Sequence, residues 1–363
     1  MAVPAVKAYF NYAGLNRLSP EIAAACHAAD ERFQRMLLSL AGIDEYNAQM
    51  ARTRKSVARL MRLETDAPDR IFLVPNATTG LSLLLQDLLA ELGTDRIAVT
   101  SDQEHPAVER VLARAESRGV RIGRIGGTSQ DEFIGRLSAL CANGGVGLVV
   151  LSQVSYKDGR ILPIARIAEQ LAPARVPLIV DGNQAVGHVP VEFPAHGCVA
   201  YVFSGHKWLR APMGTGAVVL DPDFWRRRRS AALGMLNDFQ NGTLSYLGMV
   251  GLEVGCEIAA TSLAGRIAQL DQVRRKVITA LGDLPIVKRP DWNGPMAPGI
   301  TALLLPEERP SQELTERMLS RHGVAVKAFV PPELPNEVRI SWEMSTTDAE
   351  IDLLRKALRA ELG

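Results

Sequence analysis

The sequence has only four cysteines in 363 residues, and no two of them form a CxxC pair. Cys26, Cys141, Cys198 and Cys256 are scattered along the chain. This spacing excludes zinc-ribbon and thioredoxin-like sites and is typical of small buried side chains. We therefore expect no metal site.

Long apolar runs and a charge excess are also missing. The richest apolar stretch, residues 145–151, is far shorter than the roughly 18 residues that cross a bilayer. The first residues lack the apolar core of a signal peptide, so the expected location is cytoplasmic. The 41 Lys and Arg residues balance 40 Asp and Glu residues, leaving a net charge of +1. We expect neither a membrane nor a nucleic acid among the partners.

The first two-thirds of the chain alternate short apolar runs with amphipathic stretches. Runs that are apolar at nearly every position are typical of strands buried on both faces of a sheet. This rhythm predicts a doubly wound α/β domain that binds ligands at the carboxyl ends of its strands. No G-x-G-x-x-G or G-x-x-x-x-G-K-[ST] turn follows a strand, which disfavours a nucleotide-binding protein. The expected strands are 70–74, 96–101, 121–125, 146–152, 177–181, 199–204 and 216–220, and the expected helices are 78–92, 105–119 and 130–142.

The last third has a different pattern. A long helix is expected over 247–281, and a final helix over 346–362 begins with a capping box of Thr347 and Glu350. The order predicts a smaller α+β domain, with the boundary near 255–285 inside the long helix. We assign 15–255 to a large domain and 256–363, with the N-terminal segment 1–14, to a small one. The elements expected between the two helices are a strand at 299–306, a helix at 311–323 and strands near 324–329 and 337–342.

Chemistry-bearing residues follow two of the predicted strands. Asp181 ends one strand, and Ser204, His206 and Lys207 come at the end of the next. Because the carboxyl ends of parallel strands lie at the same edge of a sheet, an acid and an amine there can contact the same ligand. A lysine flanked by Trp208 and glycine turns can be desolvated enough to act as a nucleophile.

Two motifs, DGNQAVGH (181–188) and SGHKW (204–208), resemble the class V aminotransferases, a group of pyridoxal 5′-phosphate (PLP) enzymes. The group includes cysteine desulfurases, isopenicillin N epimerase-like proteins and kynureninases. The resemblance extends over almost the whole chain. It implies the fold type I architecture, with a large doubly wound mixed sheet and a smaller C-terminal α+β domain, and it implies PLP as the cofactor.

The resemblance also implies roles for individual residues around the cofactor ring. Lys207 would form the internal aldimine, and Asp181 would keep the pyridine nitrogen protonated so that the ring withdraws electrons. Gln184 would bind the phenolic oxygen. His105, in QEHPAV (103–108), would stack on the ring face opposite the lysine. A helix N-cap is the alternative for Asp181.

A phosphate site is expected at PNATTGL (75–81), where a strand meets a helix. Free N–H groups at a helix N-terminus suit a phosphate. Ala77 and Thr78 would bind it in this family, although Thr78 or Thr79 could instead cap the helix. Ser204 and His206 are further expected phosphate ligands. Thr243 would reach the same phosphate from the partner subunit of a homodimer.

On the substrate side, Arg339 in EVRISW (337–342) matches the arginine that grips the α-carboxylate, a task for which its planar fork is suited. Asn11 in FNYAG (10–14) and Tyr156 in SQVSYKDG (152–159) are expected to line the same side. Tyr156 replaces the asparagine of the desulfurases and is closer to the epimerase-like and kynureninase-like branches.

One departure narrows the chemistry. Residues 310–338 contain no cysteine, which disfavours a desulfurase that forms a persulfide on its own cysteine. We expect an α-amino acid substrate, an external aldimine and loss of the Cα proton. An aminotransferase or a Cβ-lyase of the C–S lyase type is favoured over an epimerase, because no second base is evident. A non-catalytic PLP-binding partner protein is the remaining alternative.

Overall fold

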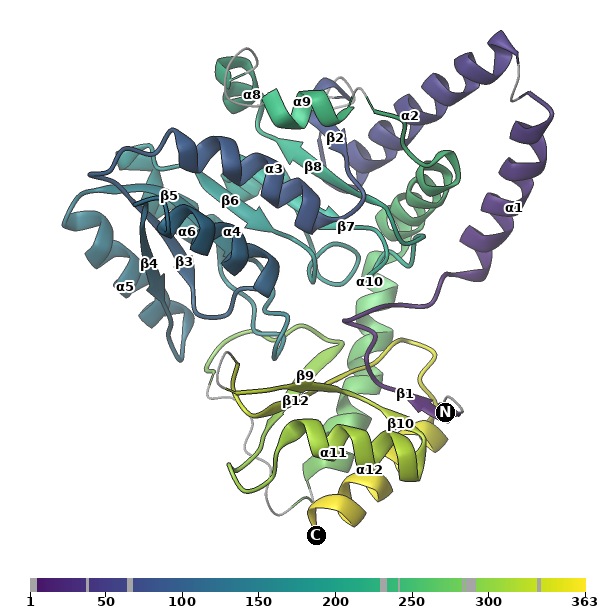
Figure 1. Cartoon of the computed structure of the whole chain (residues 1–363). Helices are drawn as coiled ribbons and strands as arrows, with labels where there is room; N and C mark the ends of the chain where they lie inside the picture. Colours follow the sequence, from purple (N-terminus) through teal and green to yellow (C-terminus); the bar gives the residue numbers. More distant parts are fainter. Residues whose placement is uncertain are drawn as a thin grey trace.

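The computed structural model describes residues 5–36, 39–63, 68–228, 234–240, 242–282, 284, 292–331 and 334–363. Residues 1–4 of the expected N-terminal segment lie outside them, as do 283, 285–291 and 332–333 of the expected small domain. Figure 1 shows a large sheet flanked by helices and a smaller sheet beneath it, with one long helix, α10 (Tyr246–Gly282), running between the two.

The large sheet has seven strands in the order β2-β8-β7-β6-β5-β3-β4. Only β8 is antiparallel to its neighbours, so the sheet is mixed, as the doubly wound fold class predicted. Its central strands are apolar because both of their faces are covered. The strands are β2 (Ile71–Leu73), β3 (Ile97–Ser101), β4 (Arg121–Ile125), β5 (Val146–Ser152), β6 (Leu178–Asp181), β7 (Ala200–Ser204) and β8 (Gly216–Leu220).

Each face of the large sheet has its own apolar core, because successive strand residues point to opposite faces. Leu148 and Val150 pack on one side with α3, α4 and α9, while Val149 and Leu151 pack on the other with α2, α5, α6 and α10. The helices are α2 (Leu40–Leu60), α3 (Ala77–Ala90), α4 (Pro106–Glu116), α5 (Gln130–Ala142), α6 (Ile164–Leu171), α7 (Phe193–His196), α8 (Pro222–Arg228), α9 (Gly234–Gln240) and α10 (Tyr246–Gly282). Short 3₁₀ turns are η1 (Pro68–Arg70) and η2 (Ala172–Ala174).

Two helices precede the first strand of the large sheet, in a region for which we predicted no helix or strand. These are α1 (Pro20–Gln34) and α2, which lie together at one edge of the molecule (Figure 1). Ser19 and Ser39 cap them by accepting hydrogen bonds from the N–H groups of Ile22 and Gly42. Serine at these positions is a recognisable start signal that could have located both helices.

The second sheet is antiparallel in the order β11-β12-β9, and its helices α11 and α12 cover the side away from the large sheet (Figure 1). The predicted capping box of Thr347 and Glu350 starts α12. The N-terminal β1 pairs with β10 in a separate two-stranded parallel sheet, which places the start of the chain beside these elements. The elements are β1 (Ala8–Tyr9), β9 (Ile300–Leu304), α11 (Ser311–Arg317), the π-helical turn η3 (Met318–His322), β10 (Val324–Ala325), β11 (Lys327–Phe329), β12 (Glu337–Ser341) and α12 (Asp348–Leu362). The division between residues 255 and 256 stays a prediction.

By length and composition alone, α10 is the one described helix that could cross a membrane. Its most apolar window is 44% buried inside the protein, and the helix packs against α1, α2 and α12. The core helix of a globular protein can have the same length and composition.

Candidate active site

The two signature motifs meet at one edge of the large sheet. Strands β6 and β7 are parallel neighbours in which Asp181 pairs with Val202. Asp181 is the last residue of β6, and Ser204 is the last residue of β7. The structure therefore brings Asp181 to the same rim as the turn that carries His206 and Lys207, as the strand pattern predicted.

Asp181 is buried and is held by the turn that follows it. Its Oδ1 accepts a 2.8 Å hydrogen bond from the N–H of Asn183, whose own Oδ1 accepts 3.0 Å from the N–H of Ser204. Residues 182–187 form turns, not a helix, so the N-cap alternative for Asp181 is wrong. Burial raises the pKa of the Asp181 carboxyl to about 6, against the opposing effects of the Asn183 N–H and Lys207.

Lys207 lies in an environment that favours its neutral amine. Its Nζ donates 3.0 Å to the carbonyl oxygen of Ala13, and Gln184 Nε2 donates 2.9 Å to the same oxygen. The Oε1 of Gln184 accepts 2.8 Å from the indole N–H of Trp208. Burial, together with the charge of Arg339, lowers the pKa of Lys207 to about 8. A sizeable neutral fraction near neutral pH is what a nucleophilic lysine requires.

His105 is the N-cap residue of α4, and its Nδ1 accepts a 3.1 Å hydrogen bond from the N–H of Ala107. Its ring meets the ring of Tyr156 edge-on, with centroids 4.9 Å apart. Burial, together with nearby cations, first among them Lys207 and Arg339, lowers the pKa of His105 to about 4. The imidazole is therefore neutral near pH 7, which suits stacking on an aromatic ring.

The predicted phosphate side gathers at the N-terminus of α3. The Oγ of Ser204 accepts a 2.9 Å hydrogen bond from the N–H of Ala77, and Thr78 is exposed in the first turn. Asn76 caps the helix by accepting 2.9 Å from the N–H of Thr79. The N-cap alternative for Thr78 or Thr79 is therefore wrong, because the side-chain oxygen of Asn76 accepts the hydrogen bond from the free N–H of Thr79.

His206 follows Ser204 in the same turn. Its Nδ1 is buried and has no hydrogen-bond partner among the described residues. Burial, together with Lys207, lowers the pKa of His206 to about 4, so the ring is neutral. A buried ring nitrogen without a partner is costly unless a ligand satisfies it.

Arg339 comes from β12 of the small sheet and is buried against the large one. Its Nη1 donates 2.7 Å to the carbonyl oxygen of Tyr156, and its Nη2 donates 2.7 Å to Oδ1 of Asn11. Within the described part of the chain its Nε has no partner, and neither does the buried hydroxyl of Tyr156. The three predicted substrate-side residues are thus in contact with one another.

Thr243 is the predicted site residue that the structure does not bring to this cluster. It is exposed just before α10, and its neighbour Leu244 accepts a hydrogen bond from, and donates one to, the hydroxyl of Tyr46 on α2. Among the described residues, no hydrogen bond or ion pair joins Thr243 to Ser204, His206 or Lys207. Its expected role requires a second subunit.

Two supporting residues were missed from the sequence. Glu104 is buried behind His105 and accepts hydrogen bonds of 2.6 Å from the hydroxyls of Ser101 and Ser152, and burial raises its pKa to about 7. The Oγ of Ser341 accepts 2.9 Å from the N–H of Ala13. Glu104 directly precedes the predicted histidine, and Ser341 follows the predicted arginine by two positions. This closeness in sequence is the signal that could have identified both residues.

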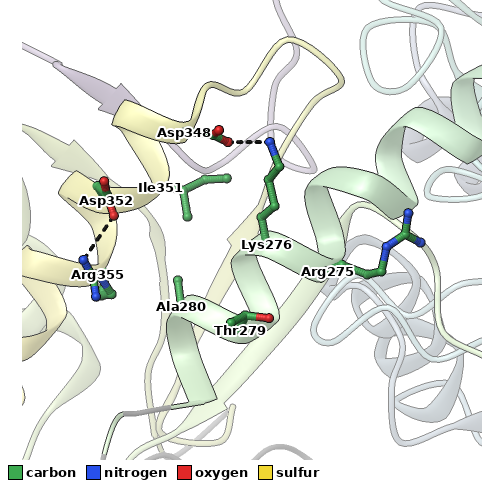
Figure 2. Close-up of a pocket in the computed structure, with 8 residues that line it drawn as sticks. All are labelled: Arg275, Lys276, Thr279, Ala280, Asp348, Ile351, Asp352 and Arg355. Atoms are coloured by element: carbon green, nitrogen blue, oxygen red, sulfur yellow. Dashed lines mark hydrogen bonds and ion pairs between the residues drawn. The ribbon is translucent and has the colours of Figure 1, made fainter.

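A separate surface groove lies between α10 and α12 (Figure 2). Four of its five charged side chains form ion pairs with one another, Lys276 with Asp348 at 2.6 Å and Arg355 with Asp352 at 3.2 Å, and Arg275 is the fifth. None of the predicted site residues lines it. It is an interface between two packed helices and holds no candidate chemistry.

The cluster at the sheet edge fits the cofactor predicted from the motifs. It contains an amine with a lowered pKa, a buried carboxyl, an unsatisfied ring nitrogen on His206 and the N-terminus of α3 beside the Ser204 hydroxyl. The aldehyde of PLP would match the amine, and its ring nitrogen would match the carboxyl. Its phosphate would match the His206 ring nitrogen and the N-terminus of α3. In the described ranges, no three His, Cys, Asp or Glu side chains are grouped to hold a metal ion.

Comparison with known proteins gives one family. The model of the family described as aminotransferase class-V matches residues 42–354. A cysteine desulfurase of Frankia sp. (strain EuIK1) is 30% identical over 288 residues, which are 73% of this chain and 65% of that protein. An isopenicillin N epimerase of Streptomyces clavuligerus is 28% identical over 353 residues, which are 88% of this chain and 86% of that protein.

Solved structures share the fold. A NifS-like protein superposes with a TM-score of 0.82 at 20% identity, over 97% of this chain and 98% of that one. The cystine C–S lyase C-DES in complex with its product cysteine persulfide gives a TM-score of 0.82 at 21% identity, over 98% and 97% of the two chains.

Proposed function

The chain belongs to the class-V aminotransferase family and is a PLP-dependent enzyme, and we propose that it acts at the α-carbon of an amino acid as an aminotransferase or a Cβ-lyase. The observation that carries the proposal is the environment of Lys207. Its pKa is lowered to about 8 by burial, at the same sheet edge as Asp181 and within reach of the charge of Arg339.

The predicted residues divide into those that would hold the cofactor and those that would hold the substrate. Lys207 would bind the cofactor covalently and Asp181 would pair with its ring nitrogen. When bound, PLP supplies a ring that withdraws electrons from the α-carbon of the substrate. The remaining cofactor contacts would come from Ala77, Thr78, His105, Gln184, Ser204 and His206.

Lys207 would also move the reacting proton. Its Nζ, whose pKa is lowered to about 8 in this chain, would be a base near neutral pH, as general base catalysis favours. It would take the proton from the α-carbon of the substrate.

Arg339 and Asn11 would receive the substrate carboxylate. The Nη2 of Arg339 donates 2.7 Å to Oδ1 of Asn11, and the buried Nε of Arg339 has no partner among the described residues, which supports an oxygen acceptor supplied by the substrate.

An amino-acid epimerase is the second candidate, favoured by the similarity to the isopenicillin N epimerase over 88% of this chain. Epimerisation requires a second acid or base on the face opposite Lys207. His105, expected on that face, has a pKa lowered to about 4 and is a poor proton donor near pH 7. An aminotransferase or a lyase needs no such group.

The test uses the purified, PLP-loaded protein and a panel of L- and D-amino acids. Reactive amino acids should change the absorption of the bound cofactor, and mass spectrometry should find either a keto acid or a product that has lost its Cβ substituent. Exchange of the α-proton with inversion, and no other product, would favour the epimerase. A protein that takes up no PLP, or whose absorption no amino acid changes, would contradict the proposal.

We also propose a homodimer in which Thr243 completes the phosphate site of the partner subunit. The exposure of Thr243 supports this proposal. Two apolar residues at the start of α2 are also exposed, Leu40 by 81% and Ile43 by 59%. Large exposed apolar side chains close together are typical of an interface.

A further inference from the structure

Arg339 has a second cation directly beside it on the small sheet. In the antiparallel register of β11 and β12, Lys327 is the residue opposite Arg339. Directly opposite residues place their side chains on the same face of a sheet, about 4.5–5.5 Å apart at Cβ. Since Arg339 points to Asn11 and Tyr156, Lys327 lies on the face that covers the active site.

This pair is unfavourable for the protein alone. Like charges directly opposite each other destabilise a sheet. Among the described residues, neither Lys327 nor Arg339 forms an ion pair, and the buried Nε of Arg339 has no partner. The acid on the same strand, Glu337, lies near Lys157 and Asp158 instead. Two cations held side by side without an anion indicate that an anion is supplied by a ligand.

The charges converge on the site from both sheets. His105 lies close enough to four cations for each to lower its pKa: Lys207, Arg339, Arg110 and Lys327. Arg339 is buried and Lys207 is half-buried, whereas Arg110 on α4 and Lys327 on β11 are exposed. Cations from both α4 and the small sheet therefore act on the surroundings of His105, in a chain whose net charge is only +1.

We propose that the substrate is an amino acid whose side chain carries a second anionic group, bound by Lys327 and Arg110, while Arg339 holds the α-carboxylate. The inference rests on the proposed function and adds the substrate class to it. The chemistry at the entrance is that of a carboxylate, sulfonate or phosphate recognised by two exposed cations. The competing explanation is that Lys327 protects the exposed edge strand β11 from pairing with another chain.

The experiment compares matched acidic and neutral ligands on the PLP-loaded enzyme. Dissociation constants are measured from the change in cofactor absorption for L-glutamate against L-glutamine, L-aspartate against L-asparagine, and O-phospho-L-serine against L-serine. At least one acidic member should bind about tenfold more tightly than its neutral partner, the size expected for one charge-assisted hydrogen bond. Added salt should reduce the preference.

Variants assign the preference to residues. Lys327→Gln and Arg110→Gln should each reduce the ratio of the two dissociation constants, Lys327→Arg should retain it, and the matched surface control Lys356→Gln should leave it unchanged. Equal binding of acidic and neutral ligands by the wild type would overturn the inference and leave the proposed function intact. A preference that survives both glutamine substitutions would overturn it too. If no amino acid changes the absorption, the proposed function fails with it.

Discussion

The Nζ of Lys207 donates a 3.0 Å hydrogen bond to the carbonyl oxygen of Ala13, 194 residues earlier in the chain. The N–H of Ala13 in turn donates 2.9 Å to Oγ of Ser341 in the small sheet. The turn at residues 11–14 therefore joins the lysine to the strand that carries Arg339.

Replacement of the lysine tests the covalent role. Lys207→Ala should reduce turnover by at least about a thousandfold, because it removes both the nucleophile and the base. Borohydride treatment should attach the cofactor permanently to the wild-type protein and not to the variant, as measured by intact mass. Lys356→Ala, a surface control on α12, should behave as the wild type. Covalent attachment in Lys207→Ala would contradict the assignment.

The carboxyl of Asp181 should make stability depend on pH in the cofactor-free protein. Its pKa in the folded chain is about 6, above the ordinary value of about 3.9. The folded form thus holds the proton more tightly, and this contribution is lost as pH rises from about 4 to about 6. Urea unfolding should show the wild type losing up to about 3 kcal/mol relative to Asp181→Asn across this window. A difference independent of pH would reject this pKa.

Arg339→Lys should weaken amino-acid substrates, because a lysine cannot form two parallel hydrogen bonds to a carboxylate. The expected increase in KM is about ten- to a hundredfold, as for loss of a charge-assisted pair. The matched measurement uses the corresponding amines without a carboxylate, whose KM should change much less. An equal increase in KM for both kinds of substrate would contradict the proposal that Arg339 binds the α-carboxylate.

Complementation tests the shared site. Lys207→Ala and Thr243→Ala chains should each be impaired alone. Co-expressed in equal amounts, they should regain about a quarter of wild-type activity, because half of the dimers are mixed and each mixed dimer has one intact site. No recovery in confirmed mixed dimers, or a fully active monomer in sedimentation, would argue against Thr243 acting in the partner subunit.

Two glycines of contrasting surroundings test the packing beneath Asp181. A Cβ on Gly182 would overlap the ring of Tyr201, whereas a Cβ on Gly135 in α5 meets nothing within 4 Å. Gly182→Ala should lower the free energy of unfolding by about 1–3 kcal/mol, the usual cost of overpacking. Gly135→Ala should raise it by about 0.5–1 kcal/mol through helix propensity. Denaturant unfolding measures both, and similar effects for the two would contradict this packing.

Local pattern predicted many elements of the large sheet closely. The strands 121–125, 146–152 and 216–220 and the helix 130–142 agree with the structure at both ends. Apolar runs bounded by turn residues carry enough local information for this. The predicted helix 311–323 was correct in position but not in type along its whole length. The α-helix ends at Arg317, and the chain continues as a π-helical turn to His322. Glycine at 323, with φ of 71°, ends it.

The sequence by itself determined the chemistry: an acid and a lysine at the ends of consecutive strands, within motifs specific to one family. Both follow from short stretches of chain, because strand ends and turns are local features. Only the tertiary structure decided which distant residues meet, such as Asn11 with Arg339 across 328 positions and Lys327 opposite Arg339. Register between strands and contact between sheets depend on packing of the whole chain, and local periodicity does not encode them.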